Sequence, residues 1–293
     1  MAIDRRRGRR LFGSDPATFD RVRPGYPPAL YRVLERRCGL GAGAVVFEIG
    51  AGSGKATREI LARKVRRLTI VEPDPRFVRF LRATLHRPRG VVTFVPKAFE
   101  DALLEPGTYD LGLAATSFHW LRERSSLRKI ARSLRPGGWW ASFMNFSNDS
   151  KRPSAFYRAV SPLWDALPGA GRPRVPRRTR NQRFRTARVD ALRASGKFDR
   201  IAVEEFRSER TLDTPTLVGL YSTFSEVSTL PGPVRRRFLR DVGELVDRRF
   251  HGRVRIPTRT TLYTARRRTA PLRARVRRTQ RRVSRPRTRS RAP

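Results

Sequence analysis

A glycine-rich turn between two acids holds the residues of this chain whose types and spacing could do chemistry. An apolar run ends at Glu48, glycines follow at Gly50, Gly52 and Gly54, and Glu72 closes the next apolar run. Glycine tolerates positive φ and leaves no Cβ between a ligand and the backbone. A carboxylate at position 72 can accept two ribose hydroxyls in charge-assisted hydrogen bonds. The pattern predicts the first βα unit of a nucleotide-binding α/β fold.

The spacing of the glycines indicates which nucleotide the turn does not bind. A dinucleotide fingerprint has the spacing G-x-G-x-x-G, but Lys55 stands where its third glycine would be. This disfavours NAD and FAD. The carboxylate of Glu72 would also repel a 2′-phosphate, which disfavours NADP.

Length and composition favour one large domain, with or without appendages, for the 293 residues. The formal net charge is +41, and only six of the 66 basic residues are lysine, so a GC-rich genome is an alternative to a functional reason for the charge. Cys38 is the single cysteine, which excludes an internal disulfide. We see no signal peptide and no membrane-spanning run, and expect a cytoplasmic protein.

The positive charge is distributed unevenly. Residues 266–293 contain 13 arginines and no acid, and residues 171–188 contain eight arginines and no acid. A run of this composition is typical of a disordered segment. The first run is compatible with electrostatic contact to nucleic acid or to an acidic membrane, but we favour an unselected extension from a GC-rich coding sequence.

Apolar periodicity and breakers predict alternating strands and helices, hence a parallel, doubly wound sheet. We expect three parts: a basic leader and active-site arm at 1–28, the main domain at 29–265 with an insertion at 145–188, and a disordered arginine-rich tail at 266–293. The expected strands are 44–49, 68–71, 91–95, 109–115, 139–143, 202–205 and 254–265. The expected helices are 29–38, 55–64, 76–85, 124–134, 155–167, 215–224 and 234–250.

Several motifs together resemble the class I S-adenosylmethionine-dependent methyltransferases. They are Phe19–Pro27 (FDRVRPGYP), Glu48–Gly54 (EIGAGSG), Val71–Asp74 (VEPD), Phe99–Asp101, Tyr109–Leu111, Phe118–Trp120 and Leu134–Gly138 (LRPGG). The resemblance covers about residues 11–265. Within the family, the chain most resembles the small-molecule branch related to trans-aconitate methyltransferases. It implies a Rossmann-like, seven-stranded sheet with an antiparallel last strand, a lid insertion after strand 5, and the ligand between strands 1 and 4.

The resemblance also implies the site. S-adenosylmethionine is the expected cofactor, its methionine part against the glycine turn, its ribose on Glu72 and its adenine beside Phe99 and Glu100. Ala115 and Thr116 would border the methyl-transfer position. The cofactor-binding residues expected are Glu48, Gly50, Ala51, Gly52, Gly54, Glu72, Phe99, Glu100, Ala115 and Thr116. No metal is expected.

His119, Tyr26 and Arg23 are the candidate catalytic residues. His119 follows strand 4 and could serve as a base, or it could be a structural histidine. Arg23 and Tyr26 lie in the arm and could bind a substrate carboxylate, or the arm could pack on the surface. The interpretation we favour is methyl transfer to a small molecule, at oxygen.

The alternatives are a nucleic-acid methyltransferase and a nucleic-acid-binding protein that keeps the fold. The charge supports both. The sequence after strand 4, Ala115–Phe118, lacks the Asn/Asp-Pro-Pro-Tyr/Phe motif of amino-methylating enzymes. Cys38 precedes strand 1 and is far from the place of a cytosine-C5 nucleophile.

Overall fold

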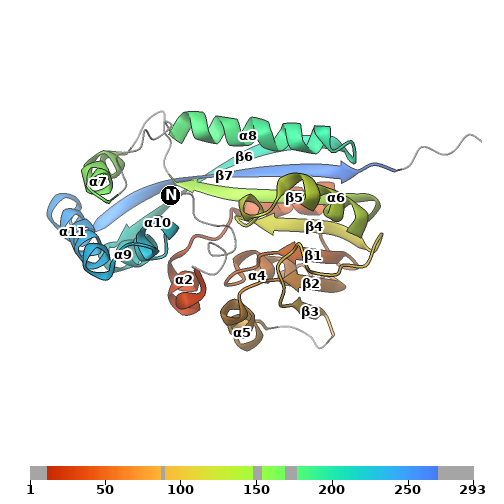
Figure 1. The fold of residues 1–293 in the computed structure, drawn as a ribbon, viewed down its shortest axis with the longest axis horizontal. Coiled ribbons are helices and arrows are strands. Elements are labelled where there is room, and N and C mark those ends of the chain that lie inside the picture. The colour runs from red at the N-terminus through yellow and green to blue at the C-terminus, as the bar shows by residue number, and fades with distance from the viewer. Residues whose placement is uncertain (1–11, 87–89, 148–153, 169–176, 270–293) are drawn as a thin grey trace, which may run out of the picture.

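A seven-stranded sheet forms the centre of the molecule (Figure 1). This computed structural model describes residues 12–86, 90–147, 154–168 and 177–269, with side chains except at 177–185. The strand order is β3-β2-β1-β4-β5-β7-β6. β1 to β5 run parallel, and β7 is antiparallel to β5 and β6, as expected. The strands are β1 (Val45–Ile49), β2 (Arg67–Val71), β3 (Val92–Val95), β4 (Tyr109–Ala115), β5 (Leu134–Ser147), β6 (Phe198–Asp213) and β7 (Arg253–Arg267).

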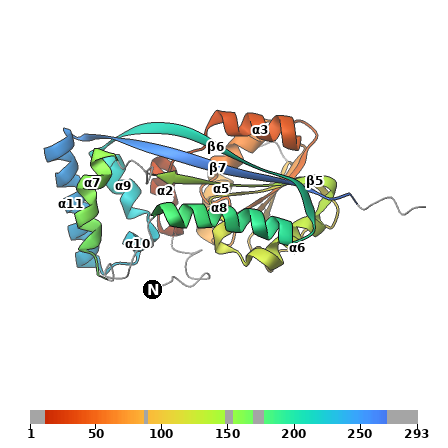
Figure 2. The same cartoon turned by 90° about the horizontal axis from the view of Figure 1, so that it is seen from above.

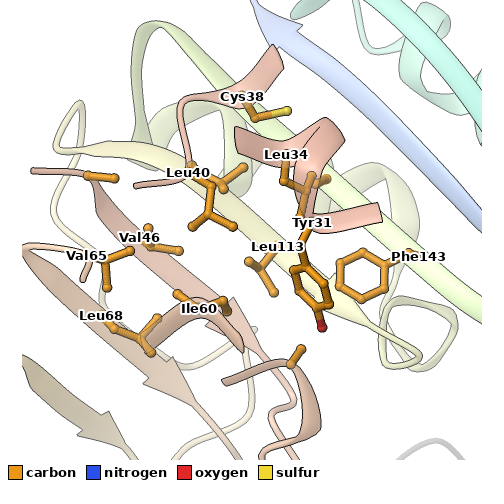
Figure 3. Packing of buried hydrophobic residues seen from close by; sticks show 14 of the residues in the cluster. Tyr31, Leu34, Cys38, Leu40, Val46, Ile60, Val65, Leu68, Leu113 and Phe143 are labelled. Atoms are coloured by element: carbon orange, nitrogen blue, oxygen red, sulfur yellow. The ribbon is translucent and has the colours of Figure 1, made fainter. Parts of the chain in front are cut away.

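Helices cover both faces of the sheet, which confirms the predicted doubly wound α/β class. α3 (Pro28–Cys38), α4 (Lys55–Ala62) and α5 (Pro75–Thr84) bury apolar side chains on one face (Figure 3). α6 (Glu123–Ser133) and α8 (Arg177–Ala194) lie on the opposite side from α3 (Figure 2). None of the helices in the described ranges is long and apolar enough to cross a membrane.

The long strands β6 and β7 carry a separate helical layer. Their pairing continues to Asp213 and Arg253, whereas β5 pairs with β7 only as far as Thr258. Beyond that point the hairpin supports α7 (Ala155–Asp165), α9 (Thr214–Ser222), α10 (Ser225–Ser228) and α11 (Gly232–Phe250), which we call the lid helices (Figure 1). They share a third apolar cluster with the hairpin tip.

The N-terminal arm contains two short helical segments. Within it, η1 (Phe12–Ser14) is followed by α2 (Pro16–Val22), whose first turn is capped by the Asp15 side chain. Gly13 has no room for a side chain, because a Cβ would lie 2.2 Å from the Asp74 carboxylate. The arm therefore packs closely against the loop that follows β2.

The predicted bounds of two strands were wrong. β5 ends at Ser147 and β6 has 16 residues instead of four, because pairing with β7 extends both strands. β5 also begins earlier than expected, at Leu134, which pairs with Tyr109 of β4. Part of the insertion is the regular helix α8, although its sequence has a weak apolar pattern. Its C-terminal half is held by tertiary packing of Leu192, which is fully buried. The predicted tail at 266–293 begins inside β7, and residues 270–293 lie outside the described residues.

A close approach between β1 and β4 makes one glycine obligatory. A Cβ on Gly112 would lie 2.1 Å from the ring of Phe47, its neighbour in the register. We expect Gly112→Ala to lower the free energy of unfolding by about 1–3 kcal/mol, because the core is overpacked. Urea unfolding measures the change. Adding Phe47→Leu to Gly112→Ala should recover part of the lost free energy of unfolding.

The matched control is Gly41→Ala, where a Cβ meets open space and φ is not left-handed. Its free energy of unfolding should stay within about 0.5 kcal/mol of the parent. Equal losses in the two variants would contradict the packing explanation.

Candidate functional site

The glycine turn after β1 has a conformation that only glycine accepts readily. Gly50, Gly52 and Gly54 all have positive φ, at 68°, 54° and 88°. A Cβ on Gly50 would lie 2.6 Å from Ser117, and one on Gly54 would lie 2.6 Å from Leu81. Gly52 differs, because the nearest atom to its Cβ would be 4.0 Å away. The turn thus packs tightly at both ends and leaves bare backbone in the middle.

Glu72 is fixed beside this turn at the end of β2. One carboxylate oxygen accepts the amide of Gly52 at 2.8 Å, and the other accepts the amide of Asp74 at 3.0 Å. Burial raises the pKa of Glu72 to about 7, although both amides favour the ionised form. Each oxygen keeps capacity for another donor, so the side chain can still bind a pair of hydroxyls.

Glu48 lies beneath the turn and is fully buried. One oxygen accepts the hydroxyl of Thr57 at 2.6 Å, and the other has no hydrogen-bond partner among the described residues. Burial raises the pKa of Glu48 to about 7. A buried carboxylate with an unused oxygen is costly, which points to a ligand that stabilises its negative charge.

The arm is bonded to the ends of the sheet strands. The Tyr26 hydroxyl lies 2.8 Å from the hydroxyl of Thr116, the residue after β4, which has a left-handed φ of 56°. The side chain of Asn145, in β5, donates to the carbonyl of Gly25 at 2.9 Å. Burial raises the pKa of Tyr26, so its phenol stays neutral. These contacts hold the arm across the carboxyl ends of β4 and β5.

Arg23 is a buried cation without an ion-pair partner. It donates to the side chain and carbonyl of Thr223 at 2.9 and 2.7 Å, which uses two of its five N–H groups. Its guanidinium lies 5.0 Å from the ring centroids of Phe19 and Phe224 and 5.9 Å from that of Phe12. No carboxylate of the described residues lies within 4 Å, and burial lowers its pKa to about 10, although the more distant carboxylate of Glu226, which also lines the cavity, favours the charged form. The arginine remains charged and can receive an anion.

His119 belongs to the short helix η2 (Phe118–Trp120) after β4. Its Nδ1 is buried without a hydrogen-bond partner among the described residues. Burial, assisted by the charge of Arg188, lowers the pKa of His119 to about 4. Arg188 lies 4.1 Å from the ring centroid of Phe118 and 2.8 Å from the Glu123 carboxylate. The imidazole is therefore neutral near pH 7.

These groups surround one cavity of about 320 Å³ at the carboxyl ends of β1 and β4. Ten of the residues predicted for the site line it: Arg23, Tyr26, Gly50, Ala51, Gly52, Glu72, Phe99, Ala115, Thr116 and His119. Glu48 and Gly54 lie behind the turn, and Glu100 lies outside the lining. The cavity thus has an acidic side at β2 and a cationic side at the arm.

The sequence analysis did not predict several of the residues that line the cavity. The missed residues come from η1, α5, the end of β5, α9 and α10: Phe12, Phe77, Asn145, Ser147, Leu220 and Glu226. Trp120, Phe224 and Ser225 also line the cavity. The missed residues carry no motif, because their role depends on which segments fold over the strand ends.

The chain is similar in sequence to known methyltransferases. Residues 46–138 match the methyltransferase domain family. An uncharacterized methyltransferase of Mycobacterium tuberculosis is 33% identical over 142 residues, which are 47% of this chain and 53% of the relative. One from Schizosaccharomyces pombe is 30% identical over 141 residues, 48% of this chain and 55% of the relative. The chain spans about half the length of these curated relatives.

Two solved structures share the fold at low sequence identity. A protein from Anaeromyxobacter dehalogenans, provisionally assigned as a type II methyltransferase, has a TM-score of 0.57 and 20% identity, over 83% of this chain and 97% of its own. Phosphoethanolamine N-methyltransferase 2 of Haemonchus contortus, solved with S-adenosylhomocysteine, has a TM-score of 0.52 and 14% identity, over 87% of this chain and 57% of its own.

The strand order, the glycine turn after β1, the acid at the end of β2 and the family match agree with one another. The relationship to trans-aconitate methyltransferases in particular stays a prediction. The chain carries a class I S-adenosylmethionine-dependent methyltransferase domain.

Proposed function

We propose that the protein transfers the methyl group of S-adenosylmethionine to an oxygen of a small, anionic acceptor. The observation that carries the acceptor class is Arg23, a buried guanidinium that faces the cavity without a carboxylate partner. A buried charge is costly unless it is paired, so the site favours a ligand that brings an anion. We also expect the protein to be cytoplasmic.

The residues of the chain fit the cofactor. The middle of the glycine turn offers bare backbone to the methionine part, and Glu72 offers two acceptor oxygens to the ribose. Phe99 and Phe77 supply apolar wall for the adenine. S-adenosylmethionine carries an ammonium and a sulfonium, and the nearby Glu48 and Glu72 stabilise positive charge. When bound, it supplies a methyl group on a good leaving group.

The acceptor side has to position an oxygen in line with that methyl group, and the rate gain comes largely from orientation. Arg23 binds the acceptor's anionic group, while the hydroxyl of Tyr26, held in the arm beside Thr116 at the end of β4, contacts the acceptor. If the attacking oxygen is a hydroxyl, neutral His119 can accept its proton. If it is a carboxylate oxygen, no base is needed.

Glu72→Gln tests the assignment of the ribose acid. We expect the dissociation constant for S-adenosylmethionine to rise by at least about tenfold, because a charge-assisted hydrogen bond contributes roughly 1.5–3 kcal/mol. Isothermal titration calorimetry measures it. The control is Glu105→Gln, whose side chain is 74% exposed and distant from the cavity lining. Unchanged affinity in Glu72→Gln would exclude this role.

The raised pKa of Glu72, about 7, predicts a pH dependence of cofactor binding. Protonation removes the charge that strengthens its bonds to hydroxyls, so affinity should fall as pH decreases from about 8 to about 6. Glu72→Gln should flatten most of this change, leaving a part from Glu48, whose pKa is also about 7. If the cofactor affinity of the parent protein did not change between pH 8 and pH 6, the result would contradict the expectation.

The same shifts predict the pH dependence of stability without cofactor. Both acids have an ordinary pKa of 4.5, so between pH 4.5 and about 7 the folded state holds more protons than the unfolded state. Their contribution to the free energy of unfolding is complete below pH 4.5 and is lost as pH rises through 7. Urea unfolding of Glu48→Gln and Glu72→Gln should show a weaker decline than the parent.

Methyl-tritiated S-adenosylmethionine incubated with cell extract tests the acceptor class. We expect label in small molecules that an anion exchanger retains, and none with a Glu72→Ala control. Arg23→Gln should reduce this transfer by roughly tenfold or more and change the cofactor dissociation constant less than about twofold. Label in a nuclease-sensitive fraction would instead support a nucleic-acid methyltransferase, the alternative favoured by the net charge of +41.

A further inference from the structure

A second hollow lies at the amino ends of the parallel strands, at the opposite edge of the sheet from the cofactor cavity. We call it the amino-end hollow, and its volume is about 710 Å³. It is formed by the end of α3, the loop to β1, and the starts of β2, β4 and β5. Its charged or aromatic lining residues are Arg36, Arg37, Arg66, Asp110, Arg135 and Trp139.

Two of its arginines have no ionic partner. The acids at the hollow are already engaged, since Arg37 pairs with Glu204 and Arg135 lies 2.7 Å from Asp110. Arg36 and Arg66 are exposed, and no carboxylate of the described residues lies within 4 Å of either. The C-terminal end of α3 carries the negative end of the helix dipole, which stabilises the positive charge of Arg36 and Arg37 in its last turn. Positive charge remains available at the rim.

The end of β7 adds three more arginines at the same edge. Arg266 donates to the carbonyl of Gly137, which lines the hollow, at 3.2 Å. Arg267 donates to the carbonyl of Leu134, and Arg268 to the carbonyl of Phe198 at 3.3 Å. Carbonyls orient these guanidiniums without neutralising them. Asp199 lies opposite Arg266 in the strand register, and no ion pair within 4 Å joins the two among the described residues.

Some arginines outside the amino-end hollow are neutralised by acids of the same helix. On α11, Arg237 lies within 4 Å of Asp241, and Arg240 and Arg248 lie within 4 Å of Glu244. α11 and the other lid helices are at the end of the molecule opposite to the end of β7 (Figure 1). Arg236 and Arg249 on the same helix have no carboxylate of the described residues within 4 Å, so the amino-end hollow differs by gathering unpaired arginines around one concave site that Trp139 also lines.

The hollow also has features that suit a flexible polyanion with flat bases. Trp139 is half-buried and lines the hollow, and an aromatic ring in such a place can stack on a nucleic-acid base. Gly39 and Gly43 have no atom within 4 Å of a Cβ position, which leaves bare backbone at the floor. The only exposed large apolar side chain of the described residues is Leu103, outside the hollow, so an apolar membrane anchor is missing here.

We propose that the amino-end hollow binds single-stranded nucleic acid, with phosphates on Arg36, Arg66 and Arg266–Arg268 and a base on Trp139. The strand is a partner and not the methyl acceptor, because the hollow and the cofactor cavity lie at opposite ends of the parallel strands. Residues 270–293, which lie outside the described residues, follow directly in sequence with ten arginines and no acid. This inference does not depend on the proposed methyl acceptor.

Fluorescence anisotropy with a labelled oligo-dT of roughly 16 nucleotides tests the proposal on the full chain. We expect Arg36→Glu with Arg66→Glu to weaken binding by roughly tenfold or more at about 0.1 M salt. The slope of log affinity against log salt should fall by about two. Cofactor affinity should be unchanged, which also verifies folding, and the Gln pair replaces the Glu pair if folding fails.

The matched control is Arg236→Glu with Arg249→Glu on α11, both exposed, which changes the net charge equally. It should weaken binding by less than about threefold. Equal losses in the two double variants would overturn the proposal, because net charge alone would then explain binding. No binding by the parent would overturn it too, as would binding to anionic phospholipid vesicles without binding to the oligonucleotide.

Discussion

The contact between the turn after β1 and the segment after β4 sets the geometry of this site. Gly50 and Ser117 approach so closely that a Cβ on the glycine would lie 2.6 Å from that of the serine, and the serine hydroxyl donates to the carbonyl of Ile49. The chain then leaves the two adjacent strands in different directions, and the cavity lies in this divergence. The remaining elements of the site are placed relative to this pair of strand ends.

Charges are arranged in the cavity by position along the sheet. Glu48 and Glu72 lie toward β1 and β2, where a cofactor with two cationic groups fits. Arg23 is held on the other side by Thr223, between the aromatic rings of the arm and the lid helices. Low dielectric strengthens each of these interactions once a ligand excludes water. The same burial makes the empty site electrostatically unfavourable, which couples ligand binding to stability.

The long β6–β7 hairpin explains how distant segments reach one cavity. It extends beyond β5 and carries the lid helices, while Arg210 in β6 donates to the carbonyl of Val22 in the arm. The arm is thus fixed from the lid side by Arg210 and from the sheet side by Asn145. Sequence patterns indicated the hairpin strands only in part, because polar residues alternate irregularly along the exposed edge strand β6.

The sequence by itself determined the parallel sheet, the glycine turn and the two acids, because each depends on local periodicity or on a conformation that only glycine adopts. It also placed Arg23, Tyr26 and His119 as candidates, through a resemblance that extends over the arm and β4. Only the tertiary structure decided that Arg23 lacks a carboxylate, that His119 is neutral, and that Phe12 and Glu226 reach the cavity. The burial of a side chain and the identity of its partners depend on contacts between segments far apart in sequence. No local sequence pattern encodes these contacts.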